Sequence, residues 1–292
     1  MINPLVDLIE LEALDTKLFR GQNYPAQWGQ VFGGQVVAQS LNAARRTVPE
    51  DRLLHSMHGY FILTGRLDTP IIYQVDTIRD GRSFTTRRVV AYQKGKPIFN
   101  LSASFQVEEA GFSHQIDMPE VASHEDLITD IAWAKANEKY VPDFLKLFFV
   151  NRHLEFRPVI RRNWKNPQKS EPINHIWIKS ENSIPDSPAL HREILAFASD
   201  YNLMSTSLLP HYGNFDPYKV QMASLDHAMW FHQDFRVDEW LLFSIDSPRS
   251  SNSRGFNRGS FFNESGQLVA SVTQEGLIRN ISKTKKQKNK IL

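Results

Sequence analysis

The sequence contains no cysteine, so disulfide bonds, cysteine-ligated metal sites and a cysteine nucleophile are all excluded. No stretch approaches the roughly 18 to 20 uninterrupted apolar residues that a membrane-spanning helix needs. The chain also has no phosphate-binding loop motif, no dinucleotide fingerprint after an expected strand, no H-E-x-x-H zinc motif and no G-x-S-x-G nucleophile elbow. These absences predict a protein without a metal, without a bound cofactor and without stable membrane insertion.

What remains has the composition of an ordinary soluble globular chain. Its 292 residues, 41% of them hydrophobic and 23% charged, predict one large or two ordinary domains. The formal net charge is only +2, and much of the basic excess lies at the end of the chain, where we expect a flexible solvated tail. Nucleic acid is therefore not an expected partner. The acidic start lacks the basic segment of a signal peptide, so a cytoplasmic location is expected. The final Lys-Ile-Leu resembles a peroxisomal address only loosely.

Two segments of the chain resemble each other, and the second carries polar residues where the first has apolar ones. Gly81–Gln106 and Ser253–Gly276 each contain an early phenylalanine, an arginine-bearing run, a glycine turn and an alternating run. Alternation on both sides of a glycine turn predicts a β-hairpin, with turns at Gly95 and Gly266. The chain is therefore expected to contain two copies of one module.

Each copy is expected to have the same order of elements, a strand entry, one helix and then four strands. The helices are expected over Gln30–Val48 and His191–Met204, and a linker helix over Asp126–Phe149 is expected to pack across both copies. Short connections favour antiparallel sheets, so the fold class is α+β, with each helix against one sheet face. The expected boundaries are 1–110 for the N-terminal unit, 111–150 for the linker with its helix, 151–280 for the C-terminal unit and 281–292 for the basic tail.

Two polar residues of the second copy fall on apolar faces. When the turns at Gly95 and Gly266 are aligned, Gln274 takes the place of Ala103 on the inward side of the last strand. The amide then needs partners, unless the strand end is exposed and Gln274 simply meets water. Asp200 lies on the apolar stripe of the second helix, where a carboxylate must be paired, hydrogen-bonded or protonated. The alternative is an aspartate at the edge of the stripe that caps the helix end.

The strand expected over Ala223–His232 is rich in groups that could do chemistry. It carries Ser224, Asp226, His227 and His232. A metal site is disfavoured because the two histidines are an odd number of residues apart, which places them on opposite faces of a regular strand. A covalent serine–histidine–aspartate triad is disfavoured because the nucleophile elbow is absent.

Two further motifs are weaker signals. Gly33 and Gly34 at the start of the first helix suit either a phosphate loop or close packing of helix against sheet, and the packing role is favoured. His55 and His58 lie in an expected strand of the first copy. One of them could be functional, although a histidine satisfied within the core or at an edge is the simpler interpretation.

Nine short segments in order resemble one family, the acyl-CoA thioesterase II family of the TesB type. The match spans nearly the whole chain except the linker and the basic tail. The segments that carry it are Phe19–Gln22, Gln30–Leu41, His55–Phe61, Gly95–Phe99, Phe197–Asn202, Ala223–His232, Glu239–Ser244, Ser253–Phe256 and Thr273–Arg279.

The resemblance implies a double hotdog fold, in which each unit wraps a sheet around its central helix. It also implies a catalytic set that matches Asp200, Ser224 and Gln274, and a reaction in which acyl-CoA thioesters are hydrolysed to fatty acid and CoA. Asp200 would activate a water, and the other two residues would orient it. Burial of Asp200 among apolar groups would raise the pKa of its carboxyl toward that of a useful base.

Other roles follow less directly. An oxyanion could be held by backbone N–H groups at Gly33 and Gly34 or before His191. The family also implies self-association into a homodimer or homotetramer. Four arginines are candidates to hold the CoA phosphates, although solvated sheet faces would explain each of them equally simply. They are Arg87, Arg88, Arg254 and Arg258.

Two rival functions stay open at this point. A hotdog hydratase or dehydratase acting on acyl-CoA would need a histidine and an acid close to the substrate, for which His58 is a possible secondary site residue. A non-catalytic acyl-CoA binding protein would bind tightly without turnover.

Overall fold

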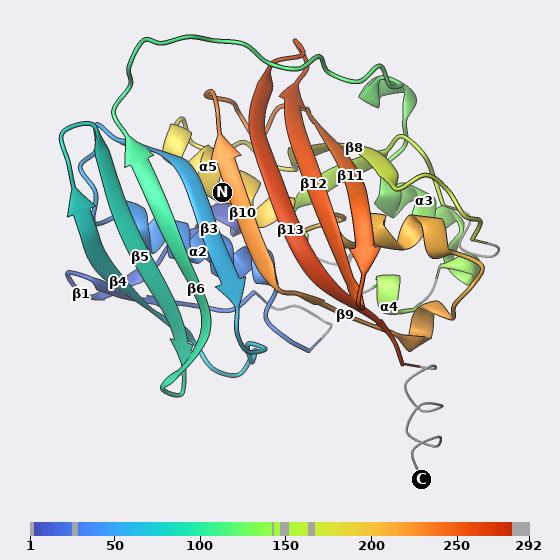
Figure 1. Ribbon diagram of the computed structural model, residues 1–292, viewed down its shortest axis with the longest axis horizontal. Coiled ribbons are helices and arrows are strands. Elements are labelled where there is room, and N and C mark those ends of the chain that lie inside the picture. Colours follow the sequence, from blue (N-terminus) through green and yellow to red (C-terminus); the bar gives the residue numbers. More distant parts are fainter. Residues whose placement is uncertain (1–2, 25–28, 142, 147–151, 163–166, 282–292) are drawn as a thin grey trace.

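The computed structural model places strands around one long helix in each half of the chain (Figure 1). Its description covers residues 3–24, 29–141, 143–146, 152–162 and 167–281. The strands of the first half are β1 (Glu12–Asp15), β2 (Leu18–Gly21), β3 (Leu53–Phe61), β4 (Ile71–Asp80), β5 (Phe84–Gln93) and β6 (Lys96–Gln106). The strands of the second half are β7 (Leu154–Pro158), β8 (Ile173–Ser180), β9 (Val220–Ser224), β10 (Asp226–Phe231), β11 (Leu241–Ser251), β12 (Arg254–Asn263) and β13 (Leu268–Asn280).

All these strands form one continuous antiparallel sheet of thirteen strands. Their order is β1-β2-β4-β5-β6-β3-β10-β13-β12-β11-β8-β7, and β9 pairs with β13 outside this path. The two halves meet where β3 pairs with β10 at the centre of the sheet. Both expected hairpin turns are present, with φ of +74° at Gly95 and +79° at Gly266, the left-handed region that favours glycine.

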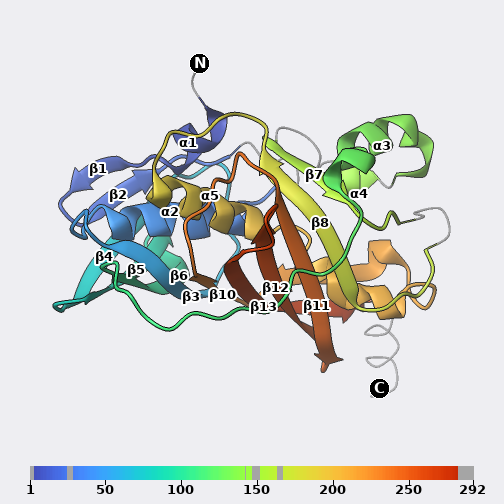
Figure 2. The same ribbon diagram turned by 90° about the horizontal axis from the view of Figure 1, so that it is seen from above.

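Two long helices, α2 (Gly33–Arg45) and α5 (Pro188–Ser199), pack against each other on the same side of the sheet (Figure 2). The expected apolar stripe of α2 is buried, but so are polar side chains around the rest of this helix. They are tolerated because they are hydrogen-bonded: Gln39 accepts from the Tyr73 hydroxyl at 2.6 Å and donates to the Leu8 carbonyl at 2.6 Å. A helix buried on nearly all sides is a central helix rather than a surface one.

The connection between the halves leaves β6 and passes over the top of the sheet toward the second half, where it is drawn in green (Figure 1). It includes the helices α3 (Asp130–Ala136) and α4 (Asp143–Lys146). We expected the linker helix to pack across both units, and for α3 this is wrong. This helix packs against β7 of the second half, where Asp130 also forms an ion pair with Arg152 at 2.7 Å. Much of the expected basic tail, residues 282–292, lies outside the described residues. Among the residues that the structure describes, no helix is long and apolar enough to cross a membrane.

Candidate active site

Asp200 lies directly after the last residue of α5. The helix runs over Pro188–Ser199, three residues earlier at its start and five earlier at its end than the expected range. It begins earlier because Ser187 accepts a hydrogen bond from the Leu190 N–H and a proline occupies the first turn. It ends earlier because Asn202 has a φ of +65°, which turns the chain out of the helix.

The Asp200 carboxylate receives three hydrogen bonds from three different elements. The backbone N–H of Gly34, in the first turn of α2, donates to Oδ2 at 2.9 Å. The Gln274 amide on β13 donates to Oδ1 at 2.7 Å, and the Ser224 hydroxyl at the end of β9 donates to the same oxygen at 3.4 Å. The carboxylate therefore does not cap its own helix but binds the positive end of the other one.

The carboxyl of Asp200 is poised to exchange a proton near neutral pH. Burial raises its pKa to about 6, and the donors Gln274, Gly34 and Ser224 partly counteract this. Protein atoms surround the carboxylate closely, yet the residue is only half-buried, so part of its surface stays open. All three donors are neutral, so the carboxylate has no cation among its hydrogen-bond partners in the described parts of the chain.

Ser224 and Gln274 reach the same point because of a β-bulge. The expected single strand over Ala223–His232 is interrupted at Leu225, where pairing with β13 shifts by one residue between β9 and β10. Such an extra residue changes which side chains share a face. Ser224 and His227, which a regular strand would place on opposite faces, both contact the Gln274 amide, at 3.3 Å and 3.1 Å.

Gln274 is fully buried, so the alternative of an exposed strand end is wrong. Its neighbours Ala270 and Val272 are buried on the same face, as the alternation predicted. The side chain is held by its NH₂ group, while its carbonyl oxygen has no hydrogen-bond partner among the described residues.

His227 is a site residue that sequence reasoning did not select. It is fully buried, and its Nε2 lies 2.9 Å from the Ser199 hydroxyl at the end of α5. Burial lowers the pKa of His227 to about 4, so its ring is neutral at physiological pH. His232, five residues later, is exposed, as the odd spacing predicted. His227 was not selected because the sequence does not reveal the bulge at Leu225, which brings its ring to the same face as Ser224.

The two glycines lie where α2 is in tight contact with its surroundings. A Cβ on Gly34 would lie 2.3 Å from the Phe197 carbonyl oxygen, and a Cβ on Gly33 would lie 2.6 Å from Asp200 Oδ2. Close packing is therefore one reason for these glycines: Gly34 packs against α5, and a Cβ on Gly33 would also lie 3.0 Å from the Phe61 ring of β3, so helix-on-sheet packing contributes at Gly33. The Gly34 N–H is already occupied by Asp200, which argues against it as an oxyanion donor.

Other expected site residues lie away from this carboxylate. His58 is exposed on the outer face of the sheet, where its ring meets Trp230 edge to face at 5.1 Å. The segment before His191 lies at the opposite end of α5 from Asp200, roughly 18 Å away along a helix of this length. Neither therefore lies beside Asp200.

The arginines divide into structural and surface residues. Arg87 is only 2% exposed and donates to the Thr47 carbonyl at 2.8 Å and to Asp80 at 2.7 Å, so it is not available for CoA phosphates. Arg254 remains partly exposed beside the site strand β13, in an ion pair with Glu275 at 2.9 Å. The other two candidates, Arg88 and Arg258, are exposed.

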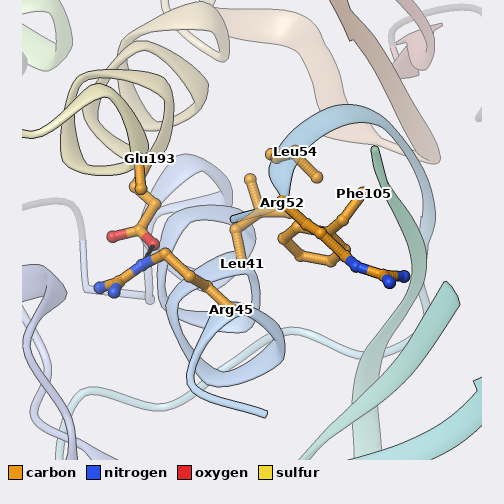
Figure 3. Close-up of a pocket in the computed structure, with 7 residues that line it drawn as sticks. Leu41, Arg45, Arg52, Leu54, Phe105 and Glu193 are labelled. Atoms are coloured by element: carbon orange, nitrogen blue, oxygen red, sulfur yellow. Dashed lines mark hydrogen bonds and ion pairs between the residues drawn. The ribbon is translucent and has the colours of Figure 1, made fainter. Parts of the chain in front are cut away.

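An ion pair between Glu193 and Arg45 joins the two helices at the end of the pair that lies away from Asp200. In Figure 3, Glu193 extends from α5 toward Arg45 at the end of α2, and their side chains are 2.6 Å apart. Asn42 adds a hydrogen bond to Glu193 at 3.2 Å. The cavity beside them, lined also by Leu41 and Phe105, has a volume of about 10 Å³, which is the size of a single water site.

A larger cavity of about 380 Å³ lies beside His191, with Asp186, Asp234 and Arg236 in its wall. Neither cavity is lined by Asp200, Ser224 or Gln274. Within the described parts of the chain, no group of three or more histidine and acidic side chains is arranged to hold a metal ion.

Known families match both halves of the chain. The family described as acyl-CoA thioesterase matches residues 144–277, and the family described as acyl-CoA thioesterase N-terminal domain matches residues 24–106. The chain is 39% identical over 280 residues to acyl-CoA thioesterase 2 of Haemophilus influenzae, a similarity that covers 96% of this chain and 98% of that protein.

Solved structures agree with the sequence comparisons. The acyl-CoA thioesterase II TesB2 of Mycobacterium marinum superposes with a TM-score of 0.78 at 36% identity, covering 94% of this chain and 98% of that one. A protein of unknown function with a hot dog fold from Alicyclobacillus acidocaldarius has a TM-score of 0.77 over 96% of this chain and 99% of that one, and at 18% identity it supports the fold alone. The chain therefore belongs to the acyl-CoA thioesterase family, as a thioester hydrolase of the thioesterase II (TesB) type with a double hotdog fold.

Proposed function

We propose that the protein hydrolyses acyl-CoA thioesters by direct attack of a water that Asp200 activates. The observation that carries this proposal is the Asp200 carboxylate held by three neutral donors, Gly34, Ser224 and Gln274. A base with a pKa of about 6 is ionised at pH 7 and still basic enough to accept a proton during attack. The substrate class is supported by the names of the relatives, which are acyl-CoA thioesterases.

The chemistry needs one water and no covalent enzyme intermediate. The water oxygen attacks the thioester carbonyl carbon while Asp200 takes the water proton. The resulting tetrahedral intermediate collapses by breaking the C–S bond, and CoA leaves as a thiolate that then takes up a proton. A thiol with an ordinary pKa of about 8.5 is a good leaving group, so a strong general acid is not required.

In this mechanism Ser224 and Gln274 act as positioning groups. Both contact Asp200 Oδ1, so a water bound at that oxygen would be within reach of a hydroxyl and an amide. A covalent path would instead make Ser224 the nucleophile. Ser224→Ala distinguishes the two, because direct attack loses only part of its rate and the covalent path loses all of it.

The decisive test is thiol release from acyl-CoA in the presence of a thiol reagent. Wild-type protein should release free CoA with a chain length preference that a panel from short to long acyl-CoAs would define. Asp200→Asn, if folded, should lose nearly all turnover. Full activity of that variant would contradict the mechanism. Tight acyl-CoA binding by the wild type without thiol release would contradict the function and favour a non-catalytic binding protein.

The hydratase or dehydratase alternative gains no support from the geometry. It relied on His58, which lies on the outer face of the sheet beside Trp230. The buried histidine near the site, His227, has both ring nitrogens within hydrogen-bond distance of protein groups, Gln274 and Ser199. An enoyl-CoA hydration assay that detects turnover in the absence of thiol release would favour this alternative.

We also propose that the protein forms a homodimer or homotetramer. Support comes from the family and from large exposed apolar side chains at the end of β3, where Tyr60, Ile62 and Leu63 are 63%, 44% and 50% exposed. Light scattering coupled to gel filtration should give a mass of two or four chains. A monomer over the working concentration range would contradict it.

A further inference from the structure

The Gln274 amide contacts three groups through one end only. Its NH₂ nitrogen lies 2.7 Å from Asp200 Oδ1, 3.3 Å from Ser224 Oγ and 3.1 Å from His227 Nδ1. Its carbonyl oxygen is buried and has no partner among the described residues. The orientation of the amide therefore depends on what the NH₂ group meets. Asp200 and Ser224 would change partners when water and substrate bind, whereas His227 is fully buried and hydrogen-bonded to Ser199, so it would keep its place.

The proton on His227 can be placed from its other neighbour. The Ser199 hydroxyl is 2.8 Å from the Ala196 carbonyl, which can only accept, so the hydroxyl donates there. Its oxygen then accepts from His227 Nε2–H at 2.9 Å. A neutral ring with a proton on Nε2 leaves a lone pair on Nδ1, which accepts from the Gln274 amide.

The other neutral tautomer of His227, with its proton on Nδ1, conflicts with an ionised Asp200 carboxylate. A proton on His227 Nδ1 would require Gln274 to turn its carbonyl oxygen toward the ring, into the place of the nitrogen. That oxygen would then lie 2.7 Å from Asp200 Oδ1, where two acceptors repel each other. The tautomer of the histidine and the orientation of the amide are thus coupled.

We propose that His227, anchored by Ser199, is a positioning residue that holds the Gln274 amide with its N–H groups toward Asp200. This inference rests on the proposed function, because it assigns the role of His227 through the water-orienting role of Gln274. The low pKa of His227, about 4 because of burial, keeps the ring neutral and its Nδ1 able to accept over the working pH range.

The test compares two amides of different length at position 227. The side-chain oxygen of Asn lies where histidine has Nδ1, so His227→Asn keeps an acceptor for Gln274, whereas the longer His227→Gln places its oxygen toward Ser199. His227→Phe removes both contacts. We expect His227→Phe and His227→Gln to lower kcat by about 10- to 100-fold with KM changed by less than about threefold. His227→Asn should recover kcat to within about fivefold of the wild type.

A matched control is available directly after β10. His232 forms a hydrogen bond of 2.9 Å with Ser271 of β13, but on the exposed outer face. His232→Phe removes a histidine–serine contact of the same kind and should leave kcat unchanged. Equal kcat for the Asn and Gln variants of His227 would overturn the proposal, and this comparison still decides if His227→Phe does not fold.

A double-mutant cycle separates positioning from general damage. If His227 acts through Gln274, then His227→Phe should lower kcat by less than about twofold in a Gln274→Ala background. A full additional loss in that background would overturn the proposal. If Gln274→Ala and Asp200→Asn both keep full activity, the proposed mechanism on which this inference rests has failed. If they lose activity while all His227 variants keep it, only the present inference has failed.

Discussion

The raised pKa of Asp200 predicts that activity and stability respond oppositely to pH. Its carboxyl has a folded-state pKa of about 6, against an ordinary value of 3.8. Below pH 3.8 it is protonated in both the folded and unfolded states, so it does not affect the free energy of unfolding. Between these values only the unfolded state ionises, so stability falls as pH rises, and above pH 6 the full cost is present. Activity should rise over the same interval, because the base must be ionised.

The size of the effect follows from the two pKa values. A difference of about 2 pKa units corresponds to about 3 kcal/mol at about 1.4 kcal/mol per unit. Because the Asp200 residue is only half-buried, we expect the free energy of unfolding to change by about 2 kcal/mol. Asp200→Asn lacks this titration, so its stability relative to the wild type should increase by that amount between pH 3.8 and pH 7. Placing an asparagine NH₂ against the surrounding donors also costs stability, but this cost is the same at every pH. It therefore cancels when the stability difference between the variant and the wild type is compared across pH values.

The measurement is denaturant unfolding of wild type and Asp200→Asn at several pH values, together with kcat/KM for an acyl-CoA. Asp226→Asn is the control. Asp226 lies two residues after Ser224, burial raises its pKa too, and it accepts from the Glu275 N–H at 2.6 Å. That variant should keep its activity. If the stability difference between wild type and Asp200→Asn does not vary with pH, while activity still falls below pH 6, another group controls the activity.

The other predictions concern the surroundings of the carboxylate. Gln274→Ala and Ser224→Ala should each lower kcat by about 10- to 100-fold, and the double variant should lose less than the product, as steady-state kinetics would show; multiplicative losses would argue against a shared water. Arg87→Ala should lower the free energy of unfolding by about 2–4 kcal/mol in denaturant titrations, because it removes a buried side chain together with its hydrogen bonds to Thr47 and Asp80. Arg88→Ala on the exposed face should change the free energy of unfolding by less than about 0.5 kcal/mol, and equal effects would contradict the assignment. Gly34→Ala should lower kcat by more than about tenfold and should also lower the melting temperature, because the added Cβ meets a backbone oxygen that cannot rotate away. Unchanged activity would show that the contact of Gly34 with Asp200 is dispensable.

The sheet was predictable from the sequence because its signals are local. Alternation of side chains and glycine turns placed both long hairpins correctly, including the turns at Gly95 and Gly266. Misplaced polar residues also identified Gln274 and Asp200, because an amide or carboxylate on an apolar face requires partners. The sequence did not say which partners these would be.

The errors came from features that local periodicity does not contain. The bulge at Leu225 shifts the register by one residue and brings Ser224 and His227 to one face. The hydrogen bond from Gly34 to Asp200 joins residues 166 positions apart. Arg87 was a candidate for CoA binding by its charge, yet it folds inward because Thr47 and Asp80 offer it acceptors. Each of these depends on long-range packing that a pattern along the chain does not specify.

The two ends of the helix pair explain why the repeated fold has one candidate site and not two. At one end of the pair, Asp200, which directly follows α5, meets the first turn of α2, and at the other, Glu193 within α5 meets Arg45 in the last turn of α2. Burial raises the pKa of Glu193 as it does that of Asp200, but the Arg45 guanidinium at 2.6 Å counteracts it. A carboxylate paired with a cation is a poor base, and the adjoining cavity holds about one water (about 10 Å³). The described hydrogen-bond donors of Asp200 are all neutral, so its carboxylate keeps its basicity. The choice of partner, arginine or amide, therefore separates the structural carboxylate within α5 from the reactive one that directly follows it.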